Sequence, residues 1–150
     1  MSEVETIPGI GVALYNTVHV AWQGDHRFDA GRPGGPTIRL DASAQTGPGP
    51  VDGLISALAA CTAVDVVDIL AKRRTPVASL TIDVKAARAD ATPKRVIGVM
   101  LAYTITGEGI DRANAERAIE LSVTKYCSVR DSLDPNLPVR WQLTLNGEAS

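Results

Sequence analysis

One stretch of the chain, residues 50–74 with the sequence PVDGLISALAACTAVDVVDILAKRR, most constrains the fold. It contains no proline after Pro50 and is rich in Ala, Leu, Ile and Val, which a helix accommodates at little or modest cost. Asp52 suits a helix start, and the basic residues 72–74 suit the negative end of the helix dipole. Thr75 precedes a proline, which pushes its backbone out of the α region. The pattern predicts a helix from Asp52 to Lys72, about 31 Å long.

Apolar side chains occur on nearly every side of this predicted helix, which is the pattern of a buried helix. One polar line remains, because Cys61, Asp65, Asp68 and Lys72 follow at the spacing of neighbouring turns on one side. Taken alone, Cys61 is most simply a small core residue, since free cysteine is among the most buried residue types. A chain of 150 residues offers such a helix thin cover, so we expect a homodimer with two-fold symmetry.

The length and charge of the chain limit the classes of protein to which it can belong. We expect a single domain over residues 1–150, with residues 1–11 as a loose arm. The net charge of −2 favours neither a nucleic-acid partner nor an anionic membrane surface. No uninterrupted apolar run approaches the length of a membrane span, so none is expected. The acidic start MSEVETIPG is unlike a secretory signal, and we expect a cytoplasmic protein with reduced cysteines.

The remaining segments alternate between strand and helix patterns. Alternating apolar residues predict strands at 12–23, 26–28, 37–40, 80–85, 96–106 and 139–145. Gly98 breaks the rhythm of the 96–106 strand and predicts a bulge. A second helix is expected from Asp111 to Tyr126, with Cys127 at its end. Strands paired as hairpins, with long helices on one face, predict an α+β fold with antiparallel sheets and a buried central helix.

Few residues can carry chemistry in this chain. His19 and His26 have no third ligand at metal spacing, so we expect no metal site. The glycines match no nucleotide fingerprint, so no cofactor is expected. The two cysteines, Cys61 and Cys127, are not in a CxxC pair, which excludes a zinc ribbon and a thioredoxin motif. These two thiols are therefore the main candidates for chemistry.

Three stretches of the chain resemble the OsmC/Ohr family. PGPVDGLISALAACTAVDVVDILAKRR is similar to its central helix, SVTKYCSVRDSL to its second cysteine motif, and VAWQGDHRF to its first strand and turn. The similarity runs in order from about Tyr15 to Leu145, and CTAVDVV resembles the OsmC-like branch. The resemblance implies an intertwined homodimeric α+β fold that reduces organic hydroperoxides to alcohols with two thiols. A dithiol reductant, for example of the lipoyl type, would then restore the enzyme.

The resemblance also implies roles for five residues. Cys61 resembles the peroxidatic cysteine and Cys127 the resolving cysteine. Asp52 occupies the position of an acid for which the family more often has Glu, so its reach is shorter by one methylene. The family's active-site arginine comes from the amino-terminal sheet, where Arg27 and Arg39 are both candidates. We favour Arg39 because it lies on a predicted strand shortly before the helix.

The chemistry of a peroxidatic thiol agrees with these roles. A thiolate is the nucleophile, so Cys61 needs a stabilising cation, which the middle of its own helix does not supply. Asp65, one turn away, would oppose ionisation unless it is paired. A sulfenic acid on Cys61 can condense with a second thiol if the two Cα atoms come within about 7 Å. Two alternatives remain: a non-catalytic member of the fold that binds a small apolar ligand at a dimer groove, and a thiol redox sensor.

Overall fold

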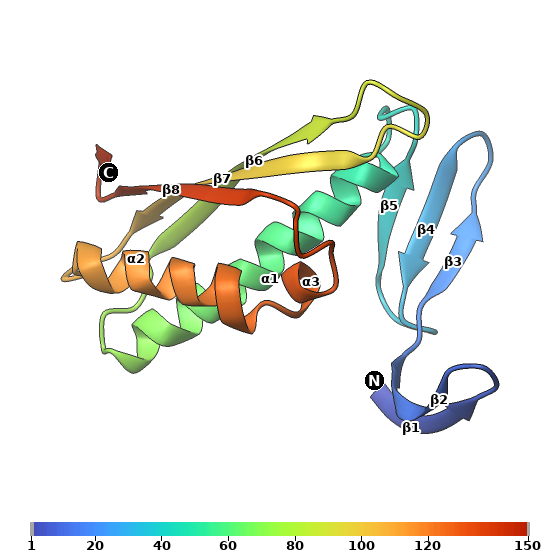
Figure 1. Ribbon diagram of the computed structural model, residues 1–150, viewed down its shortest axis with the longest axis horizontal. Helices are drawn as coiled ribbons and strands as arrows, with labels where there is room; N and C mark the ends of the chain where they lie inside the picture. Colours follow the sequence, from blue (N-terminus) through green and yellow to red (C-terminus); the bar gives the residue numbers. More distant parts are fainter. Residues whose placement is uncertain (1, 150) are drawn as a thin grey trace. The chain divides into compact units, whose positions relative to one another are not determined.

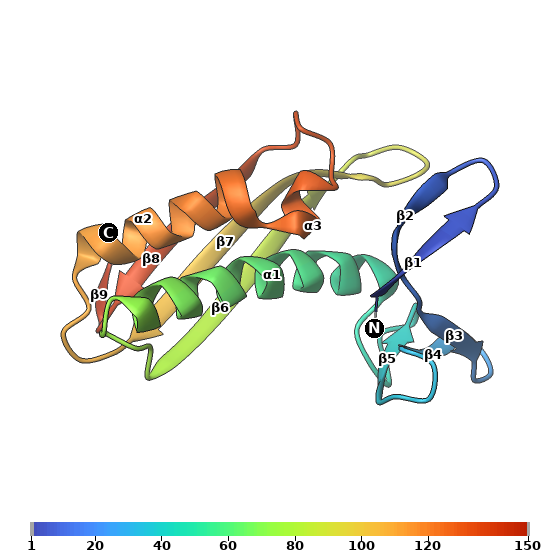
Figure 2. The same cartoon turned by 90° about the horizontal axis from the view of Figure 1, so that it is seen from below.

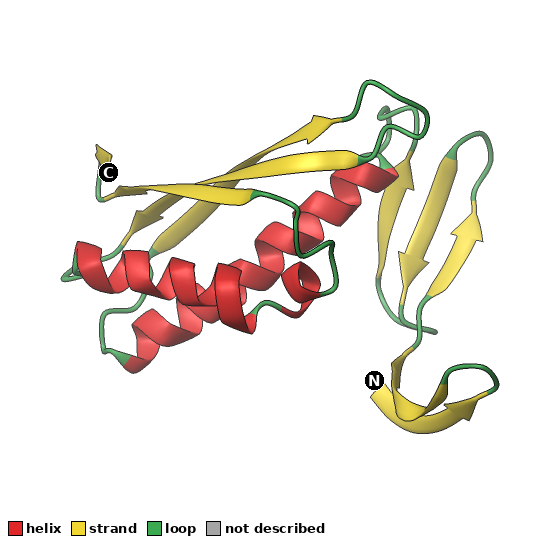
Figure 3. Ribbon diagram, viewed as in Figure 1, coloured by secondary structure: helices red, strands yellow, loops and turns green. Residues whose placement is uncertain are grey.

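The computed structural model describes residues 2–149, whose strands and helices are shown in Figures 1 and 3. The chain forms two compact units that divide between Gly53 and Leu54. This division falls in the first turn of the central helix, α1 (Pro50–Lys72), whose observed bounds agree closely with the prediction. The first unit is made of strands, and the second contains most of α1 and the rest of the helices.

The amino-terminal unit contains a β-hairpin and a three-stranded antiparallel sheet. Strands β1 (Ser2–Ile7) and β2 (Gly11–Asn16) form the hairpin, and β3 (His19–Trp22), β4 (Arg27–Gly31) and β5 (Thr37–Asp41) form the sheet in that order. The expectation of a loose arm over residues 1–11 was therefore wrong. Glu3, Val4 and Glu5 already alternate as a strand does, and Gly9 supplies the positive φ that the hairpin turn requires. The predicted single strand 12–23 is in fact β2 and β3, in two different sheets.

Apolar side chains of the three-stranded sheet lie on one face and are largely exposed. The pairing register places Val20 opposite Ala30 and Ile38, and Trp22 opposite Phe28 and Leu40, so all six residues share this face. Within the single chain, Val20, Trp22 and Ile38 are 57%, 66% and 63% exposed. This is a large apolar surface for a soluble chain to leave uncovered. It therefore bears on the expected homodimer.

Asp41 organises the small-residue linker that precedes α1. Its carboxylate accepts hydrogen bonds from the backbone N–H of Ser43 and from both the N–H and the hydroxyl of Thr46. These donors, those of Thr46 first, hold the pKa of Asp41 at about 2. The linker therefore has a defined conformation between β5 and the helix.

The carboxyl-terminal unit is a four-stranded sheet with helices on one face (Figures 1 and 2). Its strands lie in the order β6 (Ser79–Arg88), β7 (Val96–Thr106), β8 (Val139–Leu145) and β9 (Glu148–Ala149). The helices of this unit are, in chain order, most of α1, then α2 (Arg112–Leu121) and the short α3 (Ser128–Asp131). The register of β6 against β7 shifts between Ala87 and Arg88, next to Gly98, where the bulge was predicted.

One pairing in this sheet differs from the hairpin expectation. β7 and β8 are parallel, whereas β6 and β7 pair as an antiparallel hairpin. Parallel strands need a long crossover connection, and α2 lies in the connection between β7 and β8. This crossover brings the segment that follows α2, including Cys127, onto the helical face of the sheet beside the core.

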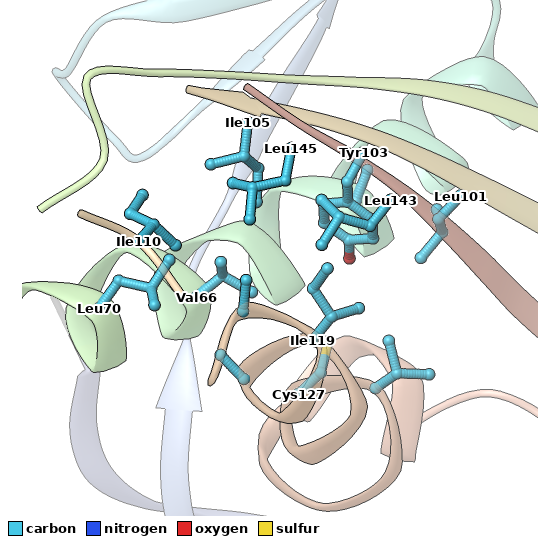
Figure 4. Packing of buried hydrophobic residues seen from close by; sticks show 14 of the residues in the cluster. Val66, Leu70, Leu101, Tyr103, Ile105, Ile110, Ile119, Cys127, Leu143 and Leu145 are labelled. Carbon is cyan, nitrogen blue, oxygen red and sulfur yellow. The ribbon is translucent and has the colours of Figure 1, made fainter. Parts of the chain in front are cut away.

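The core of the second unit lies between α1, α2 and the sheet, as Figure 4 shows. Leu58, Val66 and Leu70 are the apolar α1 residues buried most completely, and β7 contributes Leu101, Tyr103 and Ile105. By length and mean hydropathy (2.0), α1 also meets the criterion for a membrane span, contrary to the expectation from apolar runs. That expectation considered only uninterrupted runs of apolar residues, and Thr62, Asp65 and Asp68 interrupt the apolar run of α1. Its packing is that of a core helix, of which one side is uncovered in the single chain.

Candidate active site

Cys61 lies in the middle of α1 and is half-buried, packed against the core of the second unit. Asp65 follows it one turn later, and its carboxylate would oppose a thiolate at Cys61 if it were unpaired. Its partner is a neutral hydroxyl, because Ser122 donates to Asp65 Oδ2 at 2.8 Å, which orients the carboxylate and leaves its charge in place. The acid that the sequence placed beside Cys61 is therefore tied to the neighbouring helix.

Cys127 is carried by a π-helical turn rather than by the end of an α-helix. The turn, η1 (Ser122–Tyr126), continues α2 without a break, and the Cys127 N–H closes it by donating to the Ser122 carbonyl at 2.9 Å. Cys127 then begins α3, where its sulfur accepts from the Arg130 N–H at 3.3 Å. Its side chain is only 2% exposed.

The structure buries Cys127, which the sequence predicted at the end of a helix. The wide turn directs Cys127 into the core, and the α3 backbone holds its sulfur. In Figure 4 its sulfur points toward the core residues of α2 and the sheet. Cys61 is the more accessible of the two thiols, because its side of α1 is only partly covered within the chain.

The two thiols meet across α1 and the turn before α3. Burial is the largest cause that raises the pKa of Cys127 to about 11; the Arg130 N–H, the next largest effect, lowers it, and the interaction with Cys61 raises it by less. A hydrogen bond raises the pKa of its donor because it stabilises the protonated form. At neutral pH, Cys127 is therefore a thiol, and it lies close enough to Cys61 for the two side chains to interact. Both cysteines are free in the structure.

A buried polar pair lies beside the two thiols. Tyr103 and Thr62 are both almost fully buried, and their oxygens are 2.5 Å apart. The Thr62 hydroxyl uses its proton on the Ala59 carbonyl at 2.8 Å, so Tyr103 is the donor to Thr62. Burial raises the pKa of Tyr103 to about 12. No sequence pattern selects Tyr103 or Ser122, although Thr62 next to Cys61 is a visible polar break in an apolar run.

The other three predicted site residues belong to the amino-terminal unit. Arg39 Nε donates to Asp29 Oδ1 at 2.5 Å and Arg39 Nη2 to Asp29 Oδ2 at 3.2 Å, on the polar face of the sheet. Arg27 donates to the Gln23 carbonyl within the β3–β4 turn and lies 3.6 Å from Asp25. Asp52 Oδ2 accepts from the Gly49 N–H at 2.8 Å, as a residue near a helix start does.

The structure thus brings two of the five predicted site residues together. Cys61 and Cys127 interact directly, while Arg39, Arg27 and Asp52 have partners within their own unit. Over residues 2–149, no three His, Cys, Asp or Glu side chains gather as a metal site would require. Two adjacent thiols held between a core helix and a helical turn define an α+β protein with a potential redox centre.

Comparison with known proteins identifies the family. The profile of the OsmC-like protein family matches residues 41–142, a span that includes both cysteines. The protein YhfA of Escherichia coli K12 is 32% identical over 111 residues, covering 73% of this chain and 83% of YhfA. The chain therefore belongs to the OsmC family.

Solved structures have the same fold. A hypothetical protein from Aquifex aeolicus superposes with a TM-score of 0.74 at 27% identity, covering 88% of this chain and 98% of that protein. The organic hydroperoxide resistance protein OhrB of Bacillus subtilis superposes with a TM-score of 0.58 at 15% identity, covering 86% and 98%. At that identity OhrB supports the fold alone. The observed α+β architecture with a long central helix thus agrees with the prediction.

Proposed function

We propose that this protein is a thiol-dependent peroxidase that reduces organic hydroperoxides to alcohols. The observation that carries the proposal is the direct interaction of the half-buried Cys61 with the buried, protonated Cys127. A peroxidatic thiol must be reachable by substrate, whereas a resolving thiol needs only to lie beside it. Membership of the OsmC family supports the same class of reaction.

The proposed reaction has three steps. The Cys61 thiolate attacks one peroxide oxygen, the O–O bond breaks, and the alkoxide takes up a proton and leaves as an alcohol. The Cys127 sulfur then attacks the sulfenic acid on Cys61; the S–O bond breaks, and hydroxide leaves as water with the proton of Cys127. An external dithiol, such as a lipoyl-type reductant, reduces the Cys61–Cys127 disulfide and is itself oxidised.

Three residues of the amino-terminal unit complete the proposal. Arg39 is our first candidate for the cation that holds the Cys61 thiolate, and Arg27 is the rival. Their present partners, Asp29 for Arg39 and the β3–β4 turn for Arg27, would have to share or release the guanidinium. Asp52 is the candidate for the family's acid, in addition to its contact with the Gly49 N–H.

Thiol counting after stoichiometric oxidation tests this function. One equivalent of cumene hydroperoxide should consume both thiols and lower the mass by two hydrogens, and hydrogen peroxide should do so more slowly. The preference arises because Leu54, exposed on the Cys61 side of α1, can contact an alkyl group, which gains about 25 cal/mol per Å² buried. An alkyl contact of roughly 100 Å² gives about 70-fold in rate. Equal rates with both peroxides would contradict the preference, and no thiol loss would contradict the function.

The same experiment separates the alternatives. A binding protein with inert thiols would retain both cysteines after peroxide, while a sensor would oxidise once and resist reduction by a dithiol. The short reach of Asp52 and the ion pair of Arg39 with Asp29 are the observations that favour a non-catalytic ligand-binding role. Repeated turnover with dihydrolipoamide as reductant would exclude both alternatives.

We also propose that the protein is a homodimer. The exposed apolar face of the amino-terminal sheet and the exposed Leu54, Val64 and Val67 of α1 support this assignment, because a second copy would remove them from water. Multi-angle light scattering at micromolar concentration should give twice the chain mass of 15.8 kDa. A monomer mass under these conditions would contradict the proposal. Trp22→Lys, on the exposed sheet face, should weaken the dimer, and Lys72→Ala, at the exposed end of α1, is the control.

A further inference from the structure

We propose that Ser122 is a positioning residue that holds Cys127 beside Cys61 for disulfide formation. The proposal rests on the peroxidase function above and assigns a residue to its second chemical step. It follows from a chain of three contacts that begins on α1, passes through Ser122 and ends at the Cys127 backbone. Each contact lies within the carboxyl-terminal unit.

The side chain of Ser122 fastens the start of η1 to the α1 turn that carries Cys61. Ser122 is fully buried, and its hydroxyl donates to Asp65 Oδ2 at 2.8 Å and also points at the Thr62 carbonyl at 3.0 Å. Thr62 is the residue after Cys61, and Asp65 is one turn further. A single hydroxyl thus contacts two α1 residues within about one turn of Cys61, both on its carboxyl-terminal side.

The backbone of Ser122 fixes the other cysteine. Its carbonyl accepts the Cys127 N–H at 2.9 Å, which is the bond that closes the π turn. In an ordinary α-helix this carbonyl would accept from residue 126 instead, and Cys127 would project in another direction. Wide turns of this kind are rare and occur frequently at functional sites. The Ser122 hydroxyl therefore sets where the turn begins, and its carbonyl sets where Cys127 lies.

Loss of the hydroxyl should act on one chemical step. Ser122→Ala keeps the size of the side chain but removes both contacts to α1, so η1 can shift relative to Cys61. A misplacement of about 1 Å can cost about 100-fold in the rate of a positioned reaction. We expect the condensation of the Cys61 sulfenic acid with Cys127 to slow by about 10- to 100-fold. Attack of Cys61 on peroxide, which does not need Cys127, should change by less than about twofold.

Quenched single-turnover mass spectrometry with cumene hydroperoxide measures both steps. Dimedone-labelled sulfenic acid should accumulate in Ser122→Ala and not in the control Thr124→Ala, which loses a hydrogen bond to Glu120 in the same turn without touching α1. Asp65→Asn retains an acceptor oxygen and should behave as wild type. If Ser122→Ala fails to fold, Asp65→Ala removes one of the two contacts from a partly exposed site and should show accumulation in the same direction, to a smaller extent. Equal condensation rates in Ser122→Ala and Thr124→Ala would overturn the proposal.

A second oxidant separates this proposal from the proposed function. Diamide converts two neighbouring thiols into a disulfide without peroxide, and is itself reduced to the hydrazine. Ser122→Ala should form the Cys61–Cys127 disulfide about 10-fold or more slowly than Thr124→Ala with diamide as well. If wild-type protein reacts with diamide and not with peroxide, the peroxidase function is wrong and the role of Ser122 is still measured. Equal diamide rates would again count against Ser122.

Discussion

Cys61→Ser is expected to reduce peroxide turnover to the level of buffer alone. A serine hydroxyl at neutral pH is a far weaker nucleophile than a thiolate. Cys127 cannot substitute, because it is 2% exposed and its proton is retained by burial. The measurement is peroxide consumption with a dithiol reductant in excess. Turnover within tenfold of wild type would contradict the assignment of Cys61 as the peroxidatic residue.

Cys127→Ser should leave the first step intact and stop the cycle there. The variant should consume one equivalent of cumene hydroperoxide and carry a sulfenic acid on Cys61 that dimedone traps. Excess peroxide should then carry Cys61 to the sulfinic acid, since no resolving thiol remains. Peptide mapping assigns the label. A trapped sulfenic acid on Cys127 in wild-type protein would reverse the two roles, and full turnover in both single variants would contradict a two-thiol mechanism.

The second large effect is expected in the alkylation of Cys127. With its pKa raised from an ordinary 9.0 to about 11, its thiolate fraction at pH 8 is about 100-fold lower than in the unfolded chain. Iodoacetamide should therefore label Cys61 first, and Cys127 at least 100-fold more slowly in native protein than in urea.

The raised pKa of Cys127 also determines how the stability of the fold changes with pH. A raised pKa stabilises the fold while the thiol is protonated, and this contribution is lost as the pH rises from about 9 toward 11.

Peptide mass mapping at several pH values checks this labelling order. The rate at Cys127 should still rise about tenfold per pH unit at pH 9 to 10, where an ordinary cysteine begins to level off. Cys61→Ser is the control variant, because a serine can still accept the Cys127 proton. Equal labelling of the two cysteines at pH 8 would show that Cys127 is neither buried nor protonated as proposed.

The same assay distinguishes the two candidate arginines. Arg39→Ala should move the pH dependence of Cys61 alkylation to higher pH, because a thiolate without its cation is less stable. Arg27→Ala, which removes only an interaction within the β3–β4 turn, should leave it unchanged. A shift in Arg27→Ala alone would transfer the role to Arg27. No shift in either variant would remove both arginines from the site.

The sequence was sufficient for the parts of this protein that depend on local pattern. The all-round apolar stretch and its flanking proline and basic residues determined α1 almost to the residue. Asp111 was recognised as the cap of α2, and its side chain accepts from the Asn114 N–H. Family resemblance selected Cys61 and Cys127, and the structure places them together. These features follow from periodicity, capping and motif, which are encoded within a few residues of each position.

Tertiary structure decided what depends on residues far apart in the chain. The parallel pairing of β7 with β8 follows from the crossover through α2, whereas strand pattern alone gives no direction. Cys127 is buried because the turn that begins at Ser122 is one residue wider than an α-helical turn. No local propensity signals this wide turn. The position of Asp65 one turn from Cys61 was visible in sequence, and only the packing of η1 on α1 supplies the Ser122 hydroxyl that orients its carboxylate. Burial and long-range hydrogen bonds set the state of both thiols, and these exist only once the chain has folded.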